Sequence, residues 1–248
     1  HTSGDMKAYA YKTNDLGKNW TNIIPNDDVI GFTRNIQEDY ENPNLLFLGT
    51  ELGLYITING GDRWSKFTKN VPPVAVHYIE LQSQTNDLVM GTHGRGVIII
   101  DDISPLREIN EENLSNKLYF FDRDKFEIQE FGGFSDSFGR ETQFFGANPS
   151  LSCEIQYLLP KRHTFGKLTM EIQDKDGNKI TTLNPVKSKG INTVNWSYNM
   201  RTPKIAKAKT LSFGGFTSPT VPAGDYKVVI KKGRDTFEKV INVAYKNN

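Results

Sequence analysis

A short motif occurs twice in the sequence, 44 residues apart, and it constrains the fold more than any other feature. The two copies are Thr13-Asn-Asp-Leu-Gly-Lys-Asn-Trp20 and Thr57-Ile-Asn-Gly-Gly-Asp-Arg-Trp64. The Thr, the Asp or Asn, the Gly and the Trp match in register. Four matches at one spacing indicate a structural unit that the chain uses more than once.

The second copy follows a segment with the alternation of a β-strand. Leu54, Ile56 and Ile58 fall on one face, and Tyr55 and Thr57 fall on the other. The Asn-Gly-Gly-Asp sequence that comes next predicts a tight turn. Glycine accepts positive φ, and Asn and Asp side chains bond to their own backbone. Trp64 would then open the returning strand, so the motif predicts a β-hairpin.

The pattern Ser/Thr-x-Asp-x-Gly-x-x-Trp resembles the Asp-box, or BNR repeat, of sialidases, sortilin-type receptors and xyloglucan-cleaving endoglucanases. The matching residues of the two copies are Thr13, Asp15, Gly17 and Trp20, and Thr57, Asn59, Gly61 and Trp64. Asn59 stands where the family has Asp. In these families the box is a hairpin in a blade of a β-propeller, so the resemblance implies that fold and leaves the activity open. We expect Asp15 and Asn59 to fix the turns and both tryptophans to pack between blades.

The spacing of strand-like segments agrees with a propeller. Residues 29–68 have the pattern of one blade, with strands expected at 32–37, 45–50, 53–58 and 64–67. Residues 1–24 would end the preceding blade, and residues 74–104 repeat the blade more weakly, with Gly49 and Gly91 aligned at an offset of 42. The predicted fold is therefore all-β, and residues 1–106 form about two and a half C-terminal blades.

The second half of the chain predicts another β-domain. Residues 107–148 have no clear period and are expected to form a connector, while short strands recur from residue 149 to residue 248. The segment Pro222-Ala-Gly-Asp-Tyr226 resembles the last hairpin of fibronectin-like modules in secreted bacterial proteins. Residues 149–248 are thus predicted to form an immunoglobulin/fibronectin-like β-sandwich.

A longer resemblance covers essentially the whole chain. The segment from Gly91 to Arg107, Gly-Thr-His-Gly-Arg-Gly-Val-Ile-Ile-Ile-Asp-Asp-Ile-Ser-Pro-Leu-Arg, is similar to the closing blade of large secreted bacterial proteins. These are labelled glycosyl-hydrolase-like or sortilin-propeller-like. The resemblance implies a secreted or cell-surface location. Because His1 falls in the middle of a blade pattern, we expect the sequence to be part of a longer polypeptide.

Composition excludes several classes of protein. With 30 basic and 29 acidic residues, the net charge of +1 argues against a dedicated nucleic-acid surface. The sequence has no apolar run long enough to predict a transmembrane segment. The four histidines are scattered and no cofactor motif occurs, so neither a metal site nor a cofactor is expected. The single cysteine, Cys153, alternates with Ile155 and Tyr157, which indicates a buried strand residue and not a nucleophile.

Three residues are candidates for a ligand-binding face. In a propeller blade, the connection between the second and third strands lies on the face where ligands usually bind, and Glu51, His93 and Arg95 occupy such connections. Arg can form a forked contact with a carboxylate or phosphate, and His can transfer a proton. The alternative is structural, with Arg95 paired to Asp101 or Asp102 so that it holds the final blade.

Two functions remain open on these grounds. The first is a binding or scaffold module for a glycan or a protein. The second is part of a propeller-type glycoside hydrolase whose catalytic carboxylates lie mainly on blades absent from this chain. A glycosidase needs two carboxylates flanking the scissile bond. Asp101 and Asp102 point to opposite faces of a strand and cannot form that pair alone, and Glu51 with either of them is unsupported by spacing, so no catalytic residue is assigned.

A partner polypeptide follows from the blade count. Two and a half blades cannot close a ring, and open blades leave strand edges that invite association. We therefore expect another polypeptide to complete the propeller, either the N-terminal part of the same protein or a partner subunit.

Overall fold

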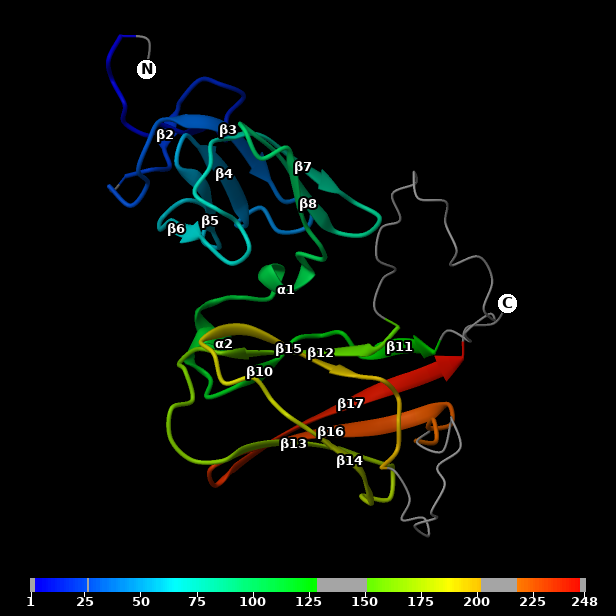
Figure 1. Ribbon diagram of the computed structural model, residues 1–248. Helices are drawn as coiled ribbons and strands as arrows, with labels where there is room; N and C mark the ends of the chain where they lie inside the picture. Colours follow the sequence, from blue (N-terminus) through cyan, green and yellow to red (C-terminus); the bar gives the residue numbers. More distant parts are fainter. Residues whose placement is uncertain (1–2, 26, 129–150, 202–217, 246–248) are drawn as a thin grey trace, which may run out of the picture. The chain divides into compact units, whose positions relative to one another are not determined.

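The computed structural model describes residues 3–25, 27–128, 151–201 and 218–245 (Figure 1). The chain divides into two units, His1–Asn113 and Leu114–Asn248. Both units are built from open sheets whose strands are antiparallel with one exception among the described residues, the parallel pair β11 and β17. The prediction of an all-β chain is confirmed.

The first unit contains three sheets that follow one another along the chain (Figure 1). Two very short strands form the first, four strands the second and three strands the third. Their bounds are β1 Tyr11–Lys12 and β2 Thr21–Asn22; β3 Thr33–Glu38, β4 Leu46–Thr50, β5 Gly53–Thr57 and β6 Ser65–Phe67; and β7 Val76–Gln82, β8 Asp87–Thr92 and β9 Val97–Ile100. Two short helices, α1 Ser104–Arg107 and α2 Glu111–Ser115, come after β9.

The two copies of the motif form the same hydrogen-bonded turn. In the first, the Thr13 hydroxyl donates to Asp15 Oδ1 at 2.8 Å and accepts the Gly17 N–H at 2.9 Å. In the second, Thr57 donates to Asn59 Oδ1 at 2.8 Å and accepts the Gly61 N–H at 3.1 Å.

The same oxygen of each Asx side chain also accepts a backbone N–H four residues further on. Asp15 Oδ1 accepts that of Asn19 at 2.9 Å, and Asn59 Oδ1 accepts that of Arg63 at 3.1 Å. The turn needs an acceptor oxygen at this position and not a charge, which is why an asparagine serves as well as an aspartate.

The tryptophans that end the two motifs have different surroundings. Trp64 is 5% exposed and its indole N–H donates to the Ile23 carbonyl oxygen, at 2.7 Å, next to β2. Trp20 is 60% exposed and its indole N–H donates within its own turn, to Gly17. Trp64 thus lies against the preceding sheet, as expected, whereas Trp20 does not, because no described sheet comes before β1.

The second sheet is covered on both faces. On one face, Leu46, Leu48 and Tyr55 share a buried cluster with Ala10 and Ile24 of the first hairpin. On the other face lies Gly49, where an added Cβ would be 2.6 Å from the Val76 carbonyl oxygen of β7. The three sheets of this unit are therefore stacked face to face, in chain order.

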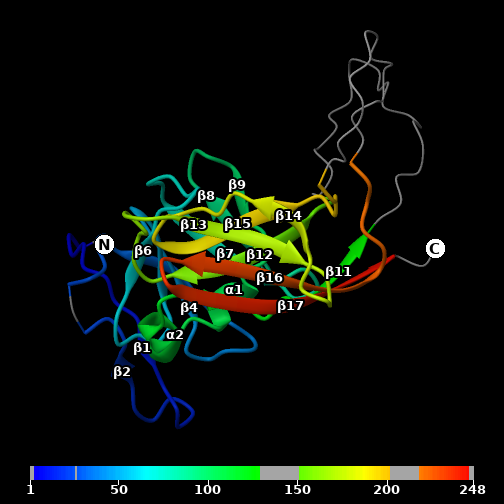
Figure 2. The same ribbon diagram turned by 90° about the horizontal axis from the view of Figure 1, so that it is seen from below.

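The second unit consists of two sheets with a shared core. In Figure 1 they form two layers, and in Figure 2 β16 and β17 run side by side. These two strands pair over nine residues of each. The sheet orders are β10-β12-β15 and β11-β17-β16-β13-β14. The bounds are β10 Tyr119–Phe120, β11 Lys125–Ile128, β12 Cys153–Leu159, β13 Leu168–Gln173, β14 Lys179–Leu183, β15 Gly190–Trp196, β16 Gly224–Lys232 and β17 Asp235–Tyr245. Buried side chains from both sheets, among them Tyr157, Met170, Trp196 and Val228, form one cluster.

The second unit begins earlier than the expected sandwich at residue 149. Two strands of the stretch expected to be a connector pair with its sheets: β10 with β12 and β11 with β17. The register joins Phe126 to Val243, and no local pattern reveals a partner so distant in sequence. The first unit likewise continues past residue 106, to Asn113. The rest of the expected connector, residues 129–150, lies outside the described residues.

Cys153 begins strand β12 and is fully buried, as its alternation predicted. Burial raises the pKa of its thiol from the ordinary 9.0 to about 12. Burial likewise raises the pKa of Tyr157 and of Tyr198 from 10.0 to about 12. A buried thiol that stays protonated is a poor nucleophile.

We expect Cys153 to resist a thiol reagent such as DTNB at pH 8 in the native chain and to react fully in denaturant. Because these three groups hold their protons more tightly when folded, their contribution to stability is complete below about pH 9. It is then lost as the pH rises toward 12. The urea midpoint of the second unit should fall over that range. Rapid stoichiometric labelling of the native chain, or a midpoint unchanged between pH 9 and 12, would contradict this account.

Candidate functional site

The predicted ligand-face residues lie in equivalent connections of the second and third sheets. Glu51 joins β4 to β5, and His93 and Arg95 join β8 to β9. The backbone repeats as well: the Glu51 N–H donates to the Phe32 carbonyl at 3.2 Å, and the His93 N–H donates to the Ala75 carbonyl at 2.9 Å. The placement of these connections between second and third strands agrees with the expectation.

A bulge at the same position of each sheet brings a further residue to this end. The pairing of β3 with β4 shifts between Thr33 and Asn35, and that of β7 with β8 shifts between Val76 and Tyr78. The extra residues are Arg34 and His77. Bulges re-aim side chains and are frequent next to functional sites. Neither bulge has a signature in the sequence, so both residues were missing from the candidates.

In the second sheet the bulged residue, Arg34, forms an ion pair with the candidate residue Glu51. Arg34 Nε and Nη2 donate to Glu51 Oε2 at 3.0 and 2.6 Å, and the guanidinium lies 4.6 Å from the centre of the Phe32 ring. The carboxylate of Glu51 is therefore already engaged by a side chain of its own sheet.

In the third sheet the equivalent pair consists of two histidines. The rings of His77 and His93 are stacked, with centroids 5.6 Å apart and planes inclined by 16°. Arg95 follows on an exposed loop in which Gly94 and Gly96 both have positive φ, 85° and 64°. Within the described part of the chain, Arg95 forms no ion pair with Asp101 or Asp102. The structural alternative for Arg95 is thus not found, and the residue is exposed.

Asp102 has a structural role. Its backbone has a φ of 47° and its N–H donates to Asp87 Oδ1 at 3.0 Å. Its carboxylate accepts the N–H of Ser104 at 3.2 Å and also the Ser104 hydroxyl, at the start of α1. Asp101 is exposed. These contacts make Asp102 a turn-forming residue, which weakens its candidacy as a catalytic acid.

The residue that fastens the end of the third sheet is Arg107. Its guanidinium forms a two-pronged contact with Asp39, at 2.9 Å on each side, and the two side chains are 9% and 0% exposed. It also donates to Asn86 Oδ1 at 2.8 Å, contacts Glu41 at 2.9 Å and lies over the Tyr40 ring at 4.7 Å.

The environment keeps Arg107 charged. Burial alone acts to lower the pKa of its guanidinium, but hydrogen bonds and charge from Asp39, with Tyr40 and Glu41, outweigh burial and raise it. Arg107 therefore joins the β3–β4 turn, at Asp39, to the β7–β8 turn, at Asn86. The ion pair that holds the final sheet thus comes from Arg107 with Asp39, and not from Arg95 with Asp101 or Asp102.

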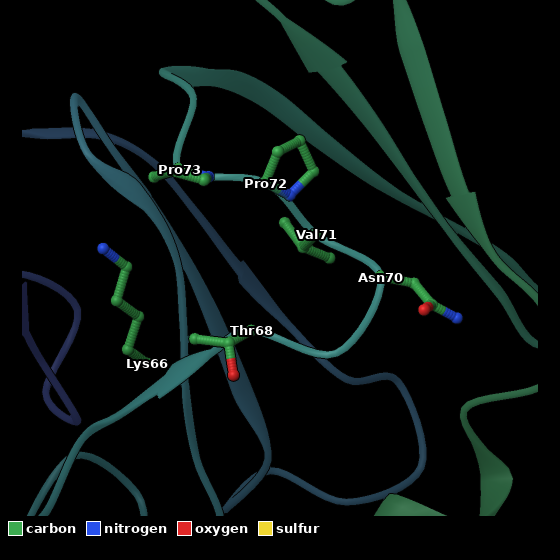
Figure 3. A pocket seen from close by; sticks show the side chains of 6 residues that line it. All are labelled: Lys66, Thr68, Asn70, Val71, Pro72 and Pro73. Atoms are coloured by element: carbon green, nitrogen blue, oxygen red, sulfur yellow. The ribbon is translucent and has the colours of Figure 1, made fainter.

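A groove of about 620 Å³ lies elsewhere in the first unit (Figure 3). It is lined by Lys66, Thr68, Asn70, Val71, Pro72 and Pro73. In Figure 3 the Asn70 side chain points away from the other lining side chains. The groove follows the segment from β6 toward β7 and includes none of Glu51, His93 or Arg95, so it does not add to the candidate face.

In residues 3–25, 27–128, 151–201 and 218–245, no group of three or more His, Cys, Asp or Glu side chains could hold a metal ion. Among the helices of these residues, none is long and apolar enough to cross a membrane. Comparison of the chain with models of protein families, with curated proteins and with solved structures gave no match.

Proposed function

We propose that the first unit is part of an Asp-box β-propeller of a secreted or cell-surface protein, followed by an immunoglobulin/fibronectin-like sandwich. The observation that carries the proposal is the repetition of structure between successive sheets. The box turn recurs with the same hydrogen bonds at Asp15 and Asn59, and the bulge recurs at Arg34 and His77. Face-to-face stacking of such sheets is the way a propeller is built.

We further propose that this segment acts as a binding or scaffold module for a glycan or protein that carries an acidic group. Arg95 and His93 offer donors on an open loop, and a guanidinium suits a carboxylate geometrically. The engaged states of Glu51 and Asp102 favour binding over glycoside hydrolysis, which would need two available carboxylates. In this proposal the ring is completed by another polypeptide.

Replacing Arg95 with alanine should weaken binding to acidic glycans by about 10-fold or more, since a charged hydrogen bond is lost. The measurement is binding of the full chain to an array of neutral, sialylated and uronic-acid glycans. Arg63→Ala is the matched control, because Arg63 is exposed on the box hairpin, at the opposite end of β5. The proposed acidic ligand would be refuted by equal signals for Arg95→Ala and the unmodified chain, or by binding to neutral glycans only.

A further inference from the structure

Among the described residues, the third sheet has no counterpart of strand β6 of the second sheet. In the second sheet β6 pairs antiparallel with β5, with Phe67 opposite Leu54 and Ser65 opposite Ile56. In the third sheet the order is β7-β8-β9, and within the described residues β9 has no neighbour on its other side. Strand β9 is therefore an open edge at the position that β6 covers in the sheet before.

The open edge presents unpaired backbone groups. The Thr92 N–H donates to the Gly96 carbonyl at 2.9 Å, and opposite residues of an antiparallel pair alternate between bonded and non-bonded pairs. From the register, Met90 and Ile98 form the next bonded pair. The N–H and C=O groups of Val97 and Ile99 thus point away from β8, toward the free edge.

The adjoining face of the third sheet carries exposed apolar side chains next to the exposed Glu80. Val97 is 65% exposed, Ile99 55% and, on the same face, Tyr78 73%. In the second sheet Leu54, at the position equivalent to Val97, is fully buried, and Ile56 and Asn35, equivalent to Ile99 and Tyr78, are partly buried, because the third sheet packs there. In the second sheet β6 covers this edge and the third sheet covers this face, whereas in the third sheet no described residue pairs with the edge and the apolar side chains are exposed.

We infer that β9 receives an extended strand from a partner polypeptide, added antiparallel along Val97–Ile100, with an apolar or aromatic residue opposite Val97. Backbone hydrogen bonds would supply most of the affinity, and the side chain opposite Val97 would add selectivity. The inference extends the proposed stacking of sheets and does not depend on the glycan site. If no strand binds to β9, the result of the glycan array is unaffected. If no acidic glycan binds, the result of the peptide experiment is likewise unaffected.

The probe is a fluorescein-labelled peptide of residues 62–69, Asp-Arg-Trp-Ser-Lys-Phe-Thr-Lys, because it contains the strand that fills this position in the second sheet. We expect saturable binding to the full chain by fluorescence anisotropy, together with slower amide exchange at Val97 and Ile99. A peptide methylated on the backbone nitrogen of Phe67 should bind roughly 10-fold more weakly, since that N–H would face β9. Methylation at Lys66 is the matched control, because its N–H would point away.

A substitution in strand β9 of the protein tests the same edge independently of the peptide variants. Ile99→Pro removes an N–H that β8 does not use, so the sheet should persist while peptide binding is lost; Ile99→Val should bind as before. The peptide variants keep the test valid should Ile99→Pro not fold. No binding, or equal binding of the two methylated peptides, overturns the inference. Dimerisation of the chain alone, with the β9 amides protected, would replace the partner strand by a second copy and overturn it too.

Discussion

Replacing Arg107 with leucine is expected to lower the free energy of unfolding of the first unit by about 3–5 kcal/mol, the usual cost of breaking a buried ion pair by removing one partner. The change leaves the carboxylate of Asp39 fully buried without its guanidinium. The backbone N–H groups of Glu41 and Asn42 would still donate to it, at 3.2 and 2.8 Å, but they do not neutralise its charge. The β3–β4 and β7–β8 turns would also lose the group that joins them.

Urea titration followed by hydrogen-exchange mass spectrometry provides the measurement, because peptides from each unit report their own transition. Arg34→Ala is the matched control. It removes an arginine from the partly exposed pair with Glu51, which is expected to contribute about 0–1 kcal/mol. Arg107→Lys should recover only part of the loss, since an ammonium group cannot form the two-pronged contact. Equal effects of Arg107→Leu and Arg34→Ala would show that Arg107 does not fasten the sheets.

The second large effect is expected for Gly49→Ala. A Cβ at this position would lie 2.6 Å from the Val76 carbonyl oxygen and 3.0 Å from its side chain. Both sheets would have to move apart, because the nearest obstacle is backbone. We expect a loss of about 3 kcal/mol, at the upper end of the range for overpacking.

Gly91→Ala is the control at the equivalent position of the third sheet. There the nearest atom to an added Cβ is Tyr78 Cβ, at an ordinary 3.6 Å. Its effect should stay within about 0.5 kcal/mol, as for most surface substitutions. Thermal or urea unfolding of the two variants compares them directly. A similar loss of unfolding free energy for both variants would mean that the face bearing Gly91 is packed as closely as the face bearing Gly49. It would contradict the inference that this face of the third sheet is exposed.

Much of the first unit could be predicted from local patterns. The strands of the second sheet lie within one or two residues of the expected ranges, and Glu51, His93 and Arg95 fall in the expected connections. Alternation, glycine and the Asx turn act over a few residues, so the sequence displays them directly. The contacts that give these residues their roles were not predictable in this way. Arg34 reaches Glu51 across a bulge, and Arg107 reaches Asp39 across 68 residues.

The second unit shows the same division. Its hairpins β13–β14 and β16–β17 could be predicted from the sequence, as alternating strands around short turns. The parallel pairing of β11 with β17 could not be predicted from local patterns. Because β11 belongs to this sheet, the unit begins at Leu114 and not at the expected residue 149. A short strand such as β10 or β11 carries too few residues for a period, and its identity depends on the partner that it meets.

The two box motifs show which features the sequence determines and which depend on the tertiary structure. The sequence alone determined their turns, because every bond in them joins residues at most four positions apart, and both copies fold alike. It could not determine that Trp64 would be buried and Trp20 exposed, although the motifs match at both positions. Burial depends on whether another sheet lies alongside, and only the tertiary structure decides that. The same reason explains why Gly49 is tightly packed and its counterpart Gly91 is open.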